Sequence, residues 1–95
     1  MERVVQVKLS RLAEKQLEKL PKHIKKLFYI WITSLEENGM NTTRKISSYH
    51  DEPLKGNRYG QRSVRLNRAF RIIYSETPEG NILLIVIIEV NKHEY

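Results

Sequence analysis

One third of the chain carries all of its net positive charge. The sequence has 17 Lys and Arg and 11 Asp and Glu, a net charge of +6. Between Arg44 and Tyr74, eight basic residues and two acids give 8 − 2 = +6, and the remainder has nine of each sign. The basic residues of this stretch are Arg44, Lys45, Lys55, Arg58, Arg62, Arg65, Arg68 and Arg71. Because guanidinium pairs bidentately with phosphate, the stretch predicts a surface for a polyanion. A solvated, charged hairpin is the simpler alternative.

Groups that could transfer protons accompany this charge. Asp51 and Glu52 are its two acids, and the sequence ends in His93 and Tyr95. From the residues alone, Glu52 could equally pair with a nearby cation, and His93 could be an ordinary surface histidine. His50, Asp51 and His93 have an irregular spacing for metal ligands, so the sequence predicts no metal site and no cofactor.

Hydrophobic periodicity predicts six elements in the order strand, helix, helix, strand, strand, strand. They are expected at Arg3–Leu9, Arg11–Leu20, Pro21–Asn38, Ser63–Leu66, Phe70–Ser75 and Ile82–Val90. Ser10 is suited to cap the first helix, and Gly39 to end the second.

The segments between these elements are expected to be irregular. Met40–Asn57 shows no clear period and is predicted to be mostly loop. Tight turns are predicted at Asn67–Arg68 and at Thr77–Gly80. The run Ile82–Val90 is almost unbroken in its apolar residues, which predicts a strand buried on both faces.

This element order predicts a single α+β domain over residues 1–95. Its two N-terminal helices are expected to cover one face of a small, mostly antiparallel, four-stranded sheet. Strand alternation then turns Val64 and Leu66 toward the helices, and leaves Arg65 and Arg71 on the open face. The aromatic residues Phe28, Trp31 and Phe70 are expected in the core.

Composition limits the kinds of covalent link and metal site that the chain can form, and its expected location in the cell. The chain has no cysteine, which excludes a disulfide framework and thiolate metal sites. No apolar run approaches the roughly 18 residues of a membrane span. The N-terminus alternates like a strand and does not resemble a signal peptide, so a cytoplasmic location without membrane contact is expected.

Three segments together resemble the RelE/ParE superfamily of toxins from type II toxin–antitoxin systems. They are EPLKG (Glu52–Gly56), RSVRLNRAFRIIY (Arg62–Tyr74) and VNKHEY (Val90–Tyr95). The element order agrees along the whole chain. The pattern is most similar to the RelE, YoeB and HigB branches, and it implies a ribosome-dependent, metal-independent endoribonuclease that cleaves mRNA and halts translation.

The resemblance also implies roles for individual residues. Glu52 matches the general base of the YoeB-like branch, Lys55 and Arg65 match basic positions that line the site, and Arg71 matches the phosphate-binding arginine. His93 and Tyr95 match a terminal pair that serves in acid catalysis and base stacking. Here Glu94 separates the two, so which one is the acid stays open; we favour His93 as the acid and Tyr95 for stacking. The further RNA-binding candidates of the basic stretch are Arg58, Arg62 and Arg68.

The partners implied are mRNA in the ribosomal A site, the ribosome with its rRNA, and a cognate acidic antitoxin. Two alternatives remain. One is a ParE-like toxin that inhibits DNA gyrase without nuclease activity. The other is a non-catalytic RNA-binding module. Codon preference, antitoxin identity and oligomeric state do not follow from the sequence.

Overall fold

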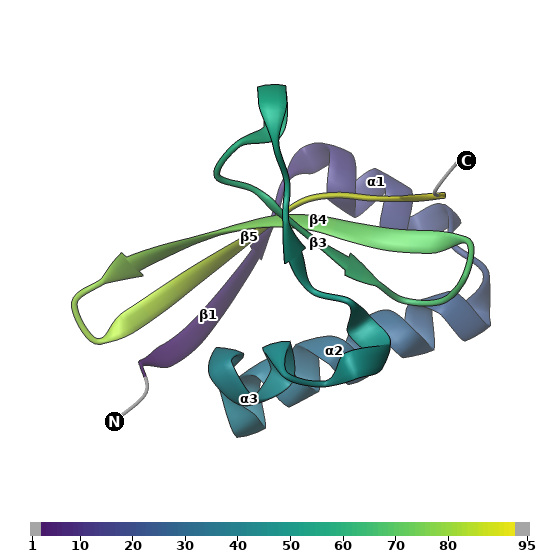
Figure 1. Ribbon diagram of the computed structural model, residues 1–95. Helices are drawn as coiled ribbons and strands as arrows, with labels where there is room; N and C mark the ends of the chain where they lie inside the picture. Colours follow the sequence, from purple (N-terminus) through teal and green to yellow (C-terminus); the bar gives the residue numbers. More distant parts are fainter. Residues whose placement is uncertain (1–2, 93–95) are drawn as a thin grey trace.

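One mixed sheet organises the protein, whose computed structural model describes residues 3–92 (Figure 1). In chain order the elements are β1 (Val4–Leu9), α1 (Arg11–Lys19), α2 (Lys22–Asn38), α3 (Met40–Arg44), η1 (Ser47–Tyr49), β2 (Glu52–Pro53), η2 (Gly56–Arg58), β3 (Arg62–Arg65), β4 (Phe70–Glu79) and β5 (Ile82–Lys92). The strand order is β1-β5-β4-β3-β2. The β1–β5 pair is parallel and the other pairs are antiparallel.

The two long helices share one hydrophobic core with the sheet, as predicted. Ser10 caps α1 by accepting a hydrogen bond from the Ala13 backbone N–H at 3.0 Å, and its hydroxyl donates to the Ile88 carbonyl of β5 at 2.6 Å. The buried stripe of α2 consists of Ile24, Phe28, Trp31 and Leu35. These side chains pack with inward residues of β3, β4 and β5. Among residues 3–92, no helix is both long and apolar enough to cross a bilayer.

Gly39 makes the break between α2 and α3. Its φ of 83° and ψ of 166° lie in a region that is open almost only to glycine. Its N–H still donates to the Leu35 carbonyl at 3.0 Å, so the end of α2 is satisfied while the chain changes direction.

The segment predicted to be mostly loop contains more structure than its sequence suggests. It holds α3, η1, η2 and the two-residue strand β2, so the sheet has five strands and not four. β2 pairs with β3 through Glu52↔Ser63 and Pro53↔Arg62. This strand was not predicted because two residues, one of them proline, are too few to show the alternation of apolar and polar residues that marks a strand.

The turn predicted at Thr77–Gly80 is wrong. β4 continues to Glu79 and β5 begins at Ile82, so Gly80 and Asn81 alone connect them. Pro78 is tolerated inside β4 because β3 pairs with β4 only as far as Tyr74. Beyond that point β4 is an edge strand, where a missing N–H breaks no ladder.

The prediction of a β5 buried on both faces holds only in part. Ile85, Ile87 and Val90 are buried in the core, whereas Leu84, Val86 and Ile88 are half-buried. The antiparallel β4 partner and the single helical layer leave the other face of β5 partly open to solvent.

Tyr74 connects the core to a buried charge. Its ring lies 5.4 Å from Trp31, centroid to centroid, and its hydroxyl donates to Asp51 Oδ2 at 2.6 Å. Burial, and then the hydrogen bond to the Asp51 carboxylate, raise the pKa of Tyr74 above its ordinary value. Both causes oppose ionisation of the phenol in the folded state.

This shift predicts a loss of stability at alkaline pH. Below about pH 10 Tyr74 is neutral in both states, and above it the phenol ionises only in the unfolded chain. The free energy of unfolding therefore falls as pH rises, by up to about 1.4 kcal/mol per pH unit from this group. We expect Tyr74→Phe to show a shallower decline in urea titrations between pH 9 and 11. Tyr59→Phe, at a solvent-exposed tyrosine, is the control, and an unchanged slope in Tyr74→Phe would contradict the assignment.

Candidate active site

The face of the sheet opposite the helices carries two cross-strand rows of side chains. Strand register aligns Glu52, Ser63, Ile73 and Glu89 in one row, because each is paired with the next. The second row is Arg65, Arg71 and Asn91. Side chains paired in this way lie about 4.5–5.5 Å apart at Cβ. The register therefore brings the predicted base, Glu52, to the same face as the predicted phosphate-binding arginines.

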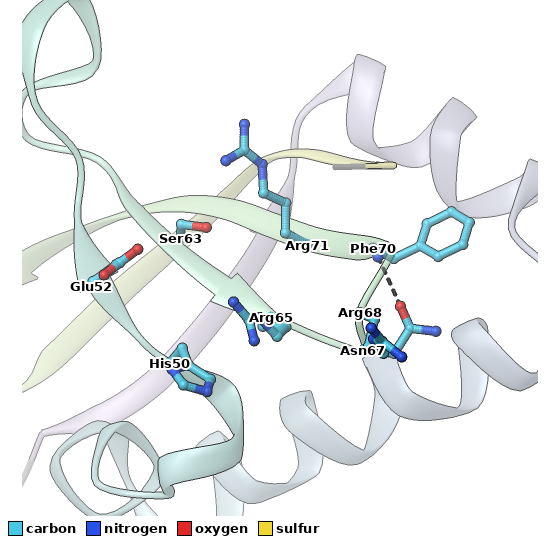
Figure 2. A pocket seen from close by; sticks show the side chains of 8 residues that line it. All are labelled: His50, Glu52, Ser63, Arg65, Asn67, Arg68, Phe70 and Arg71. Carbon is cyan, nitrogen blue, oxygen red and sulfur yellow. Dashed lines mark hydrogen bonds between the residues drawn. The ribbon is translucent and has the colours of Figure 1, made fainter. Parts of the chain in front are cut away.

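A small cavity lies over these rows (Figure 2). Its volume is about 60 Å³, and it is lined by His50, Glu52, Ser63, Arg65, Asn67, Arg68, Phe70 and Arg71. It is far smaller than the roughly 300–1,000 Å³ of a typical small-molecule pocket. An extended ligand would thus lie across the cavity, with one small group inserted in it.

Three charged side chains at this cavity have no protein partner among residues 3–92. Glu52, Arg65 and Arg71 form neither an ion pair nor a side-chain hydrogen bond there. Arg71 Nε is moreover buried without a hydrogen-bond partner. Leaving a buried donor unsatisfied costs about 1–3 kcal/mol. A ligand with anionic oxygens would provide what these cations lack.

Arg65 and Arg71 are directly opposite each other on β3 and β4. Like charges at such a position destabilise a sheet. Figure 2 shows the two guanidinium groups extending in different directions from these paired positions, and each can direct two N–H groups at phosphate oxygens of an extended anion. The pair is thus better explained by binding than by stability.

Other arginines of the basic stretch are held by carboxylates. Arg62 Nε donates to Asp51 Oδ1 at 2.7 Å, and Asp51 Oδ2 lies 3.8 Å from Arg44 Nε. The side chain of Asp51 is only 1% exposed. With the Tyr74 hydroxyl, these groups satisfy a carboxylate inside the protein, on the side of β2 away from the cavity.

Arg58 fixes the loop that follows β2. Its guanidinium forms an ion pair with Glu89 of β5 and donates to Gln61 Oε1 at 2.9 Å. Figure 1 shows this loop, with η2, rising from the sheet on the side opposite α2. The Arg58–Glu89 ion pair crosses the cross-strand row that contains Ile73. Ile73 is fully buried although it faces away from the helices. Arg58 therefore closes one end of the open face.

The predicted site residues divide into three groups. Glu52, Arg65, Arg68 and Arg71 line the cavity together, whereas Lys55, Arg58 and Arg62 do not. His93 and Tyr95 lie outside the described residues. Their roles in catalysis and RNA binding stay predictions.

The sequence reasoning missed four residues that line the cavity: His50, Ser63, Asn67 and Phe70. Ser63 was recognisable, since it alternates with Val64 on the same strand as Arg65. Phe70 was assigned to the core, and it does pack there, half-buried, while it also contributes to the cavity lining. Asn67 accepts hydrogen bonds from the Ala69 and Phe70 backbone N–H groups, both at 2.8 Å, and so shapes the β3–β4 turn.

Within residues 3–92, no three His, Cys, Asp or Glu side chains are grouped so that they could hold a metal ion. Whether the chain uses a metal stays a prediction of the sequence.

Solved structures with a similar fold are toxins of toxin–antitoxin systems. YafQ from E. coli strain BL21(DE3) has a TM-score of 0.75 at 18% identity, over 93% of this chain and 92% of that one. The YoeB/ParE toxin from Agrobacterium tumefaciens has a TM-score of 0.74 at 17% identity, over 94% and 99%. This chain has the RelE-like fold. The E. coli DinJ–YafQ toxin–antitoxin complex also matches, with a TM-score of 0.74 at 21% identity, over 95% and 93%. No protein-family model and no curated protein matches the sequence.

The RelE-like fold here places two adjacent acids in opposite environments, which predicts opposite effects of their removal. Asp51→Ala leaves Arg44, Arg62 and Tyr74 without their common partner, and breaking such a buried pair costs about 3–5 kcal/mol. Glu52→Ala removes an exposed, unpaired side chain and should change stability by no more than about 0.5 kcal/mol. Urea unfolding of the two variants measures both. Equal losses would show that Asp51 does not anchor β2.

Proposed function

We propose that this protein is the toxin of a toxin–antitoxin pair and acts as an endoribonuclease. Its substrate is mRNA in the ribosomal A site, and cleavage needs no metal ion. The result is an arrest of translation.

One observation carries the proposal. In a RelE-like fold, a carboxylate and two arginines from paired strand positions line one cavity on an open sheet face, and none of the three has a partner within residues 3–92. These groups match two requirements of RNA cleavage by the neighbouring 2′-hydroxyl, namely a base for the hydroxyl proton and cations for the phosphorane. A surface that only bound nucleic acid would have no use for an unpaired carboxylate among its arginines.

The reaction proceeds by one displacement at phosphorus. Glu52 removes the proton from the 2′-hydroxyl as its oxygen forms a bond to phosphorus. Arg65 and Arg71 stabilise the negative charge on the non-bridging oxygens. The bond to the 5′-oxygen breaks and that oxygen takes up a proton, which leaves a 2′,3′-cyclic phosphate and a free 5′-hydroxyl. His93 and Tyr95 are proposed to join the site from the C-terminal segment, where they hold the message or supply this proton.

The other cations have supporting roles in the proposal. Arg68, at the mouth of the cavity, contacts the message backbone, and the exposed Lys55 extends the positive surface toward rRNA. Arg58 and Arg62 contribute charge while they remain bound to Glu89 and Asp51. Binding to RNA should therefore weaken steeply with salt.

A cognate antitoxin is the proposed protein partner. Similar folds occur in solved complexes such as YoeB–YefM from Staphylococcus aureus and RelE–RelB from Pyrococcus horikoshii. An acidic segment that covered the open face would neutralise Arg65 and Arg71 and would block access to the cavity.

The opposed arginines give the test of the proposed function. Arg71→Ala should abolish growth inhibition, because removing one donor to the developing anion costs roughly 2.7–4 kcal/mol of transition-state stabilisation. The same change relieves a like-charge contact, so the thermal midpoint should stay equal or rise. Induction in a host without the antitoxin measures toxicity, and thermal unfolding of the purified variant measures stability. A folded Arg71→Ala variant that remained fully toxic would contradict the proposal.

The chemistry itself is tested by mapping the message in a cell-free translation reaction. Wild-type protein should produce fragments with 5′-hydroxyl ends, and Glu52→Gln should leave the message intact while retaining ribosome binding. An intact message together with blocked DNA supercoiling would instead select gyrase inhibition, and RNA binding with neither effect would select a non-catalytic module.

A further inference from the structure

His50 is the imidazole that the structure places in the cavity with Glu52. Its side chain lines the same hollow as Arg65, from the segment that connects η1 to β2. Figure 2 shows Arg65 extending from β3 toward the side of the cavity where Glu52 and His50 lie. The proposed cleavage mechanism gives His50 no role.

The backbone at His50 adopts a conformation that disfavours side chains. With φ of 44° and ψ of 47° it lies in the left-handed region, and it is the one residue other than glycine with positive φ within residues 3–92. Glycine is the ordinary choice there, and asparagine, aspartate and histidine are the residues enriched after it. The turn holds the backbone of a histidine whose side chain lines the cavity beside Glu52.

The position of His50 is fixed from both sides. Its N–H donates to the Ser47 carbonyl at 3.2 Å, which ends η1, and the next residue is the buried Asp51. After this turn, Asp51 faces the interior and Glu52 pairs with Ser63 at the cavity, as strand alternation requires. The backbone of His50 is thus fixed by its neighbours, and its exposed side chain extends from this fixed point into the cavity lining.

We propose that His50 is the general acid of the cleavage reaction. The inference rests on the proposed function and completes its proton balance. Glu52 takes the proton of the 2′-hydroxyl as the new bond to phosphorus forms. The imidazolium of His50 gives its proton to the 5′-oxygen as the bond from that oxygen to phosphorus breaks. His50 then takes the role that the sequence favours for His93, and the C-terminal His93 and Tyr95 hold the message.

The test uses a message in which the leaving 5′-oxygen at the cleaved bond is replaced by sulfur. A sulfur at the 5′-bridging position departs as a thiolate and needs no proton, so it makes a general acid unnecessary. The scissile bond is first mapped on ordinary message with the wild-type protein. Single-turnover rates on programmed ribosomes are then measured for two messages, one with oxygen and one with sulfur at that bond.

We expect His50→Asn to slow cleavage of the oxygen message by about 10²–10⁴-fold, the range of general acid catalysis. The sulfur message should be cut at nearly the wild-type rate. Asparagine tolerates the left-handed conformation, so the thermal midpoint should not fall. Glu52→Gln should slow both messages, because each still requires removal of the 2′-hydroxyl proton. His23→Asn, at an exposed histidine of α2, is the matched control and should change neither rate.

Three results would overturn the inference. Equal slowing of both messages by His50→Asn would assign His50 to positioning. An unchanged rate would remove it from the reaction. Sulfur rescue of His93→Gln, in the absence of such rescue for His50→Asn, would return the role to the C-terminal segment. In each case the wild-type protein still cleaves, so the proposed function stands. If the wild-type protein cuts neither message, the proposed function fails and this inference fails with it.

Discussion

The arrangement of the open face depends on the buried carboxylate of Asp51. It receives hydrogen bonds from Arg62 of β3 and Tyr74 of β4, and Arg44 of α3 is close by. Arg44 precedes Asp51 in the chain whereas Arg62 and Tyr74 follow it, and β2 itself offers only two residue pairs to hold it in the sheet. The carboxylate therefore fixes β2, and with it the residues before and after Asp51.

The two faces of the sheet carry different kinds of charge. The paired charges around Asp51 lie on the inner face, and charges without a partner among the described residues lie on the outer face. Inside, the buried Asp51 pairs with Arg62, and the half-buried Glu76 pairs with Arg44. Burial lowers the pKa of Arg44, but the hydrogen bonds that Arg44 donates to Tyr74 and Glu76 outweigh it and hold this pKa above its ordinary value. Outside, Arg65 and Arg71 occupy paired strand positions without a protein anion among the described residues. The first set fixes the strands, and this allows the second set to keep an unfavourable arrangement.

Much of this design could be predicted from the sequence, because alternation and helical periodicity report burial directly. The stripe ending in Trp31 and Leu35 predicted α2, and the positions of Val64 and Leu66 correctly placed Arg65 on the opposite face. What escaped prediction depends on contacts between distant segments. Asp51 and Glu52 are chemically alike and adjacent, and only the distant Tyr74 and Arg62 decide which one is buried.

The left-handed turn at His50 was not predicted either, because a single histidine in a segment without period gives no local sign of a positive φ. Pro78 led to a turn being predicted where the structure has a strand, because proline close to Gly80 is typical of a turn. The strand can contain this proline because β3 is short and does not pair with this part of β4. Local signals thus predicted the elements, and the long-range pairs determined the site.

The parallel pairing of β1 with β5 affects how the protein can fold during its synthesis. Val4–Leu9 find their partners at Ile82–Ile87, and α1 is tied to the same strand through Gln16, whose side chain accepts a hydrogen bond from the Val90 N–H. While the chain is being synthesised, β1 can contact α1 and α2, but β1 and α1 lack their main partner until β5 has emerged. Contacts of such large sequence separation also slow folding. The sheet of the nascent chain therefore stays incomplete, and the cavity on it unformed, until β5 has been synthesised.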